Sequence, residues 1–189
     1  MSAAEDVRSA IGALARGEVI AFPTETFYGL GADALDGAAL DRLRALKGRG
    51  ADKAISLLVT EAMLDLIVAE IPPRARALMA AHWPGALTLA LPARPGLPEA
   101  LVSEGCVAVR CSPHPIASAL VAGLGRPVTA TSANPAGAPP PTTAAGVRAH
   151  FGDRCLIVDG GATPGGLPST RVRVRGDTIE VLRAGAISI

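Results

Sequence analysis

The spacing of hydrophobic and polar positions predicts an alternation of helices and short strands along the whole chain. Val7, Ile11 and Leu14 recur at helical spacing, which predicts an amphipathic helix over about residues 3–16. The apolar run at 18–22 predicts a buried strand, because a proline and a polar run follow it directly. Further strands are predicted at 55–59, 87–91, 107–110, 128–131, 156–158, 172–175 and 178–182, and further helices at 38–47, 75–81, 116–121 and 143–150.

This order of elements predicts an α/β protein with a mixed β-sheet covered by helices. Two runs rich in glycine and proline, 135–141 and 160–168, are predicted to be surface loops rather than linkers, because strands resume after each. The sequence contains no internal repeat. We therefore expect one domain over residues 1–189, a length at which a single core buries most of its apolar surface.

The overall charge excludes a global field that would attract polyanions or membranes. The chain has 18 basic and 17 acidic residues, a formal net charge of +1, so any anion site must be local. Aromatic residues are only 3% of the chain, which argues against a surface that stacks successive bases. We find neither a signal peptide nor an apolar run of about 18 residues, and we expect a cytoplasmic protein without a membrane segment.

Lysine and cysteine usage adds two observations. The only lysines, Lys47 and Lys53, lie in one short segment. A genome that encodes surface cations as arginine explains this, and so does a site that requires a compact ammonium group. Cys106, Cys111 and Cys155 form no CxxC pair and have no histidine at a metal-ligand spacing, so we predict buried free thiols and no zinc site.

Four polar clusters follow or interrupt predicted strands, where α/β proteins tend to bind ligands. They are PTETFYG at 23–29, KGR at 47–49, TSAN at 131–134 and PST at 168–170. No cluster contains a nucleophile paired with a base, and His82, His114 and His150 have no partner at the spacing of a hydrolase triad. The clusters instead supply hydroxyls, amides and cations, which bind phosphates and orient polar substrates.

The residues alone leave two interpretations of each cluster open. Lys47 and Arg49 are suited to clamping a polyphosphate, and equally to a solvated helix end. Ser132 and Asn134 are suited to binding a ligand, and equally to a turn in which they bond their own backbone. The PST segment fits a similar turn. Neither a Walker A sequence nor a strand-linked GxGxxG is present, which disfavours ordinary P-loop and Rossmann sites.

At these clusters the sequence closely resembles the YrdC/TsaC family of threonylcarbamoyl-AMP synthases. The combination of PTETxYGLG, KxR and SxN is highly specific, whereas KxR alone would mean little. The matching segments run in family order: 17–34, 46–49, 55–59, 83–91, 107–110, 131–137, 159–161, 168–172 and 182–185.

The resemblance implies a single-domain YrdC-like α/β fold, with a twisted mixed β-sheet flanked by helices and an open ligand groove. It implies that L-threonine, bicarbonate and ATP give threonylcarbamoyl-AMP and pyrophosphate, for threonylcarbamoyl-adenosine modification of tRNA beside the anticodon. The implied partners are downstream tRNA threonylcarbamoyl-transferase proteins, with weak direct binding of tRNA. Mg²⁺ is the expected partner of the phosphates, although the sequence shows no acidic ligand pair for it.

The resemblance also assigns site residues by position. The KxR and SxN tetrad falls on Lys47, Arg49, Ser132 and Asn134, which would form the catalytic clamp. The threonine and bicarbonate side would comprise Thr24, Thr26, Arg110, Ser132 and Ser169, with Thr26 favoured over Thr24. The ATP side would comprise Lys47, Arg49, Lys53, Asn134, Thr142 and Arg183.

The sequence departs from the family pattern at two positions after Arg49. The family often has proline at the positions of Gly50 and Ala54. Their replacement predicts a more mobile loop after Arg49, which orders when ATP binds. The end of the chain at Ile189 resembles the short members without an additional C-terminal domain. An RNA-binding module of the same fold and a diverged carbamoyl-adenylate-handling paralogue remain the alternatives to the synthase.

Overall fold

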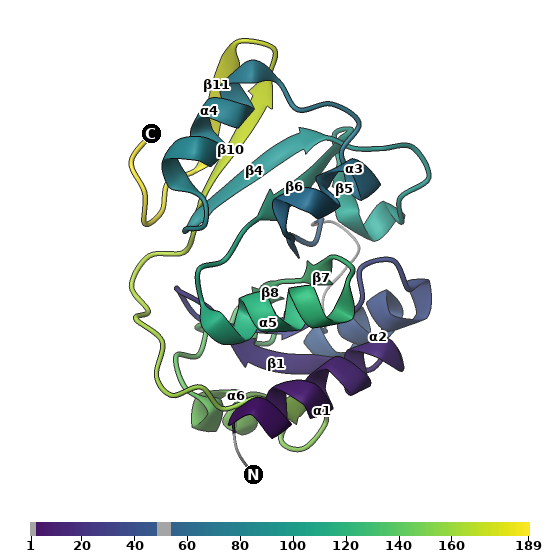
Figure 1. Ribbon diagram of the computed structural model, residues 1–189. Helices are drawn as coiled ribbons and strands as arrows, with labels where there is room; N and C mark the ends of the chain where they lie inside the picture. The colour runs from purple at the N-terminus through teal and green to yellow at the C-terminus, as the bar shows by residue number, and fades with distance from the viewer. Residues whose placement is uncertain (1–2, 49–53) are drawn as a thin grey trace.

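The computed structural model describes residues 3–48 and 54–189, and its strands form two sheets rather than one (Figure 1). The smaller sheet has the order β8-β2-β1-β9 and the larger one β11-β10-β4-β6-β3-β7, with β5 also paired to β6. Both sheets contain parallel and antiparallel pairs, so the predicted mixed α/β class is confirmed.

The helices and strands have the following bounds. The smaller sheet comprises β1 (Ile20–Pro23), β2 (Tyr28–Gly31), β8 (Thr131–Ser132) and β9 (Leu156–Ile157). The larger sheet comprises β3 (Leu57–Leu58), β4 (Leu87–Pro92), β5 (Val102–Ser103), β6 (Cys106–Arg110), β7 (Val128–Thr129), β10 (Thr170–Arg175) and β11 (Thr178–Arg183). The helices are α1 (Ala3–Ala15), α2 (Gly37–Lys47), α3 (Leu64–Ile67), α4 (Pro73–His82), α5 (Pro115–Leu124) and α6 (Ala144–Phe151), with 3₁₀ turns at Glu61–Met63 and Glu99–Leu101.

Ala130 is the point at which one extended segment changes sheets, so the strand predicted at 128–131 is two short strands. Thr129 pairs with Leu57 of the larger sheet, and Thr131 pairs with Leu30 of the smaller one. Between them, the Ala130 N–H donates to the Ser56 carbonyl over 2.8 Å. The prediction of one sheet was therefore wrong in detail, because alternating burial does not reveal which strand is the partner.

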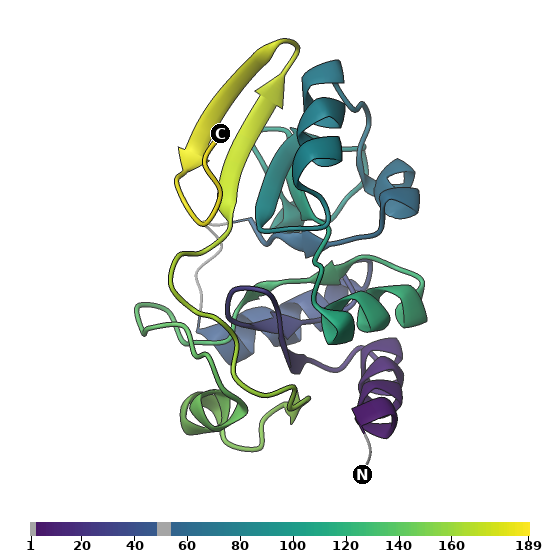
Figure 2. The same cartoon turned by 60° about the vertical axis from the view of Figure 1, so that its left-hand side comes forward.

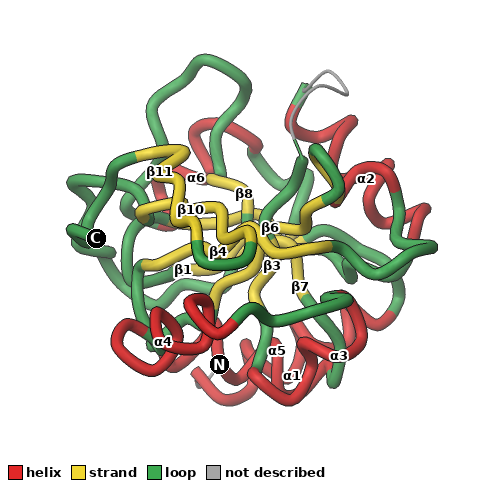
Figure 3. The backbone as a smooth tube through the Cα atoms, turned by 90° about the horizontal axis from the view of Figure 1, so that it is seen from above, coloured by secondary structure: helices red, strands yellow, loops and turns green. Residues whose placement is uncertain are grey.

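The hydrophobic core lies around the strands, and the helices lie outside them (Figure 3). The helices α1 and α5 lie side by side and cover one face of the smaller sheet, with Leu14 and Leu120 buried against Phe22 (Figure 1). The central strands β4 and β6 are buried along almost their whole length, as expected of strands covered on both faces.

The second helix ends where the sequence predicts, because both of its ends are capped. The Asp36 carboxylate accepts the N–H groups of Ala38 and Ala39, and Gly48 adopts a left-handed conformation with φ of 61°. These caps fix Lys47 in the last turn.

The β2 strand was not predicted, because its glycines give little strand signal. Gly31 is required by packing: a Cβ there would lie 2.6 Å from the Phe22 ring.

The structure also bears on the remaining composition-based expectations. Cys106 is a buried free thiol, whereas Cys111 and Cys155 are only partly buried. Burial raises the pKa of both partly buried thiols. Among residues 3–48 and 54–189, no three histidine, cysteine or acidic side chains are grouped to hold a metal ion. In the same ranges, each helix is too short or too polar to cross a membrane.

Candidate functional site

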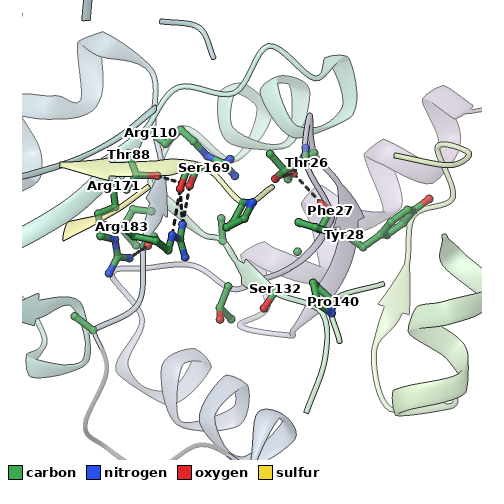
Figure 4. Close-up of a pocket in the computed structure, with 18 of the residues that line it drawn as sticks. Thr26, Phe27, Tyr28, Thr88, Arg110, Ser132, Pro140, Ser169, Arg171 and Arg183 are labelled. Atoms are coloured by element: carbon green, nitrogen blue, oxygen red, sulfur yellow. Dashed lines mark hydrogen bonds between the residues drawn. The ribbon is translucent and has the colours of Figure 1, made fainter. Parts of the chain in front are cut away.

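A cleft of about 880 Å³ is lined by residues of both sheets (Figure 4). The smaller sheet and its loops contribute Thr24, Thr26, Phe27, Tyr28 and Ser132. The larger sheet contributes hydroxyl side chains and three arginines: Ser56, Thr88, Ser103, Arg110, Ser169, Arg171 and Arg183. Residues of three of the four polar clusters identified in the sequence therefore line the same cleft. Its three arginines concentrate positive charge locally, although the net charge of the chain is only +1.

The turn between β1 and β2 presents two threonines to the cleft in different ways. The Thr24 hydroxyl donates to the Phe27 carbonyl over 2.7 Å and accepts the Thr26 N–H over 3.2 Å. Thr24 thus closes the turn with its own side chain, as hydroxyl residues often do. The Thr26 hydroxyl lies 3.2 Å from that of Thr24 and keeps capacity for a ligand. This difference supports the preference for Thr26 as a substrate contact.

Arg110, at the end of β6, already has a carboxylate partner. Its Nη1 lies 2.5 Å from Oε1 of Glu25, and the two side chains are only 8% and 15% exposed. The Ser112 hydroxyl donates to the other oxygen of the same carboxylate. Burial lowers the pKa of Arg110, and the Glu25 charge opposes that shift. Glu25 was not among the predicted site residues, because its partner is 85 residues away; its place between Thr24 and Thr26 was the available signal.

Ser169 and Arg183 were assigned to opposite sides of the site, but the structure brings them into direct contact (Figure 4). The Arg183 Nη2 donates to the Ser169 carbonyl over 2.7 Å and to its hydroxyl over 3.1 Å. That hydroxyl is 2.9 Å from the hydroxyl of Thr88 on β4, a residue the sequence analysis did not single out. Burial lowers the pKa of Arg183, and electrostatic repulsion from Arg110 lowers it further. The two guanidinium groups are therefore close enough to interact.

Arg171, on β10, completes the arginine group and is likewise engaged within the protein, because its Nη2 donates to the Ser56 hydroxyl. Its cross-strand neighbour is Arg183 on β11. An anion in the cleft would therefore meet guanidinium groups that are already oriented by neighbouring oxygens.

Lys47 is not among the described residues that line the cleft, but it contacts a segment that does. Its ammonium donates to the Ser132 carbonyl over 2.5 Å and to the Asn134 carbonyl over 3.1 Å. The Ser132 hydroxyl is 3.4 Å from the same nitrogen. The structure thus brings together three of the four residues of the predicted clamp, with Ser132 alone of the three lining the cleft. In this arrangement the lysine orders the loop after β8.

Asn134 adopts the turn role that the sequence left open, and one atom of its side chain stays unpaired among the described residues. Its Nδ2 donates to the carbonyls of Ala138, over 2.6 Å, and Pro135, over 3.0 Å, which is the turn interpretation. Its Oδ1 is buried and has no hydrogen-bond partner among the described residues. A buried acceptor without a donor is costly, so this oxygen is suited to receive a hydrogen bond from a ligand.

Three further predicted site residues are Thr142, Arg49 and Lys53, of which only Thr142 lies in the described ranges. Thr142 does not line the cleft within the described ranges; its carbonyl instead accepts the Thr163 N–H over 2.8 Å. Arg49 and Lys53, and with them the predicted mobile loop at Gly50, lie outside the described residues. Ala54, the first described residue after that gap, lines the cleft.

Two titratable side chains near the cleft are held by backbone groups, and one of them, Tyr28, also donates a long hydrogen bond of 3.4 Å to Oδ1 of Asp159. His114 Nδ1 accepts the Ile116 N–H at the start of α5 over 3.3 Å, and burial lowers the pKa of His114. The Tyr28 hydroxyl donates to the Gly161 carbonyl over 2.7 Å, and burial raises the pKa of Tyr28. The site is therefore equipped to bind and align anionic substrates, with cations and hydroxyls in place of a strong base.

Comparisons with known proteins converge on one family. The family model Sua5/YciO/YrdC, described as telomere recombination, matches residues 12–185. A threonylcarbamoyl-AMP synthase of Bacillus subtilis is 39% identical over 186 residues, covering 96% of this chain and 54% of the relative. One from Thiobacillus denitrificans is 43% identical over 173 residues, covering 90% of this chain and 91% of the relative.

A solved structure has the same fold and a bound ligand. The crystal structure of P. abyssi Sua5 complexed with L-threonine matches with a TM-score of 0.90 and 38% identity, covering 98% of this chain and 55% of that one. The chain thus spans about half the length of the Bacillus and P. abyssi relatives and about nine-tenths of the Thiobacillus one.

Proposed function

This chain belongs to the Sua5/YciO/YrdC family, and on that premise we propose that it is a threonylcarbamoyl-AMP synthase. It would convert L-threonine, bicarbonate and ATP into threonylcarbamoyl-AMP and pyrophosphate. The observation that carries the proposal is the cleft in which Arg110, Ser169 and Thr26 face one another, in a fold that superimposes on a threonine-bound relative with a TM-score of 0.90.

Threonine would bind on the side of the cleft formed by Thr26, Arg110 and Ser169. Its carboxylate suits the guanidinium of Arg110, because arginine binds carboxylates through parallel N–H donors. Its hydroxyl and amine suit the hydroxyls of Thr26 and Ser169, which are buried and therefore selective for groups that satisfy them. Thr24 would shape this turn rather than touch the substrate.

ATP would bind across the loop after β8. Ser132 lines the cleft there, and the buried Oδ1 of Asn134 needs a donor such as an amino or hydroxyl group of the nucleotide. Arg183, and Arg49 and Lys53 from the adjoining segment, would neutralise phosphate charge. Lys47 would hold the two carbonyls that shape this loop, and reach phosphate only if it left them.

The chemistry suits a site of cations and hydroxyls. An amine and bicarbonate form a carbamate readily, and the carbamate oxygen then attacks the α-phosphorus of ATP while pyrophosphate departs. This step needs in-line alignment and stabilisation of charge on the phosphate oxygens more than proton abstraction. The described residues contain no cluster of three or more histidine, cysteine or acidic side chains to hold Mg²⁺, so we assign the metal only to the phosphates of ATP and derive no step through it.

The product is a mixed anhydride, an activated acyl group that a transferase can pass to tRNA. We propose such transferase proteins as downstream partners in the cytoplasm, with at most weak binding of tRNA by this chain itself. The three arginines of the cleft are turned toward internal oxygens, which favours a small anionic substrate over a long phosphate backbone.

The test is an assay with ATP, bicarbonate and threonine, followed by pyrophosphate release and by mass spectrometry of the adenylate. We expect pyrophosphate only when threonine is present, and near-complete loss of activity in Lys47→Ala and Arg49→Ala. Turnover without threonine would overturn the proposal. Tight, salt-dependent tRNA binding without turnover would favour the RNA-binding module, and turnover with carbamoyl phosphate in place of threonine would favour the carbamoyl-adenylate paralogue.

A further inference from the structure

An ion pair joins the two sheets next to the cleft. Glu25 lies in the turn between β1 and β2 of the smaller sheet, and Arg110 is the last residue of β6 in the larger one. The 2.5 Å contact between Oε1 and Nη1 therefore crosses from one sheet to the other. Within the described ranges, Arg110 lines the cleft and Glu25 does not.

The Glu25 carboxylate is itself held in place by a third residue. The Ser112 hydroxyl donates to Oε2, which occupies the oxygen that does not face Arg110. The same hydroxyl accepts the His114 N–H over 3.2 Å, at the start of α5. Two rigid elements, the end of β6 and the beginning of α5, therefore fix the carboxylate at both oxygens.

This arrangement leaves part of the Arg110 guanidinium available to the cleft. A guanidinium has five N–H donors in a rigid plane, and Glu25 Oε1 is bound at Nη1. Fixing one edge of that plane sets the direction of the others. A donor group that is oriented before the ligand arrives binds more tightly, because less conformational freedom is lost on binding.

We propose that Glu25 is a positioning residue, which orients Arg110 toward the carboxylate of the amino-acid substrate. The inference deepens the proposed function and rests on it for the identity of that substrate. Two effects of Glu25 oppose each other: its negative charge repels a bound carboxylate, and its hydrogen bond orients the group that binds it. The proposal is that orientation dominates, because the pair is buried and its geometry is fixed by Ser112.

The sign of one substitution separates the two effects. Glu25→Gln removes the negative charge and replaces one of the two acceptor oxygens by an NH2 group, so the side chain can no longer accept from both Arg110 and Ser112. A purely electrostatic role of Glu25 predicts a lower KM for threonine. Positioning predicts a KM for threonine raised about tenfold or more, with the KM for ATP within about twofold of the parent value. The matched control is Glu18→Gln, which removes the same charge from an exposed pair with Arg16 at 2.7 Å, and should change neither KM.

Coupling to Arg110 is the second requirement. In an Arg110→Ala background, Glu25→Gln should raise the KM for threonine by less than about twofold further, because the group it positions is gone. Independent, multiplicative effects would overturn the proposal. So would a lower KM for threonine in Glu25→Gln, or a parallel rise of both KM values with a lower melting temperature, which would indicate a general structural role.

A readout without substrate keeps this inference distinct from the proposed function. In protein labelled with ¹⁵N-arginine, the Nη signals of Arg110, assigned by Arg110→Lys, should be separate in the parent chain because rotation of the guanidinium is hindered. Those signals should merge in Glu25→Gln and stay separate in Glu18→Gln. If the parent chain did not use threonine, the proposed function would fail while this result still supported positioning; unchanged Nη signals in Glu25→Gln would refute positioning itself.

Discussion

Replacing Lys47 by methionine tests whether this lysine orders the loop after β8 before any nucleotide binds. Methionine keeps the length and most of the volume of the buried side chain but removes the ammonium. The carbonyls of Ser132 and Asn134, which accept hydrogen bonds at 2.5 Å and 3.1 Å, then lose that donor. We expect the variant to be less stable than the parent even without substrates, and to lose ATP-dependent activity as well.

The magnitude follows from two charged hydrogen bonds. Each contributes about 1.5–3 kcal/mol, or about 3–6 kcal/mol together. Relief from burying the ammonium offsets part of this, so we expect the free energy of unfolding to fall by about 2–4 kcal/mol. For a chain of this size, each kcal/mol shifts the melting temperature by about 2–4 °C, so the midpoint should fall by about 4–16 °C.

The assay is thermal unfolding of the unliganded protein, followed by circular dichroism, together with the rate of pyrophosphate release at a temperature where the variant is folded. Arg44→Met is the matched control, because it removes a cation from the same last turn of α2 and Arg44 is not among the described residues that line the cleft. Its melting temperature should stay within about 3 °C of the parent value. If Lys47→Met lost activity but unfolded at the parent temperature, the loop-ordering role of Lys47 would be refuted.

Three further predictions follow from packing and from pKa shifts. Gly31→Ala places a Cβ 2.6 Å from the Phe22 ring and should destabilise the fold by about 1–3 kcal/mol in denaturant titrations, whereas Gly37→Ala meets open space and should cause no loss. Asn134→Asp removes the donors to the Pro135 and Ala138 carbonyls and buries a charge, so calorimetry should show weaker binding of ATP. An unchanged affinity for ATP would contradict the placement of the nucleotide at Asn134. Burial lowers the pKa of His114 in the folded state, so its contribution to stability is present above the unfolded pKa and is lost as the pH falls through the lowered folded pKa. His114→Asn should therefore flatten the fall in melting temperature between pH 7.5 and 5.5. An unchanged slope would be evidence against this role of His114.

The location of the site could be predicted from the sequence, because polar clusters at strand ends are a local signal. The segments holding Thr26, Ser132 and Ser169 were identified in this way, and all three residues line one cleft. The end of α2 at Lys47 was also predictable, since the glycine that ends it, Gly48, is the next residue in the sequence.

The partners of the charged residues could not be predicted from local pattern. Glu25 meets Arg110, and Lys47 meets Ser132, across 85 residues of sequence in each case. Which strand lies beside which is decided by packing over such separations, and the division into two sheets at Ala130 follows from the same cause. The long segment from β9 to β10 runs from the smaller sheet to the larger one (Figure 2), and Ser169, which precedes β10, lines the cleft. The organisation of residues 1–189 as a single domain stays a prediction.

The most direct test of the central claim is mass-spectrometric detection of the adenylate formed from ATP, bicarbonate and isotopically labelled threonine. The account predicts a product that carries the threonine label together with AMP, in amounts equal to the pyrophosphate released, and its absence in Lys47→Met and Arg110→Ala. Pyrophosphate release without a labelled adenylate, or the same amount of labelled product from both variants, would contradict it.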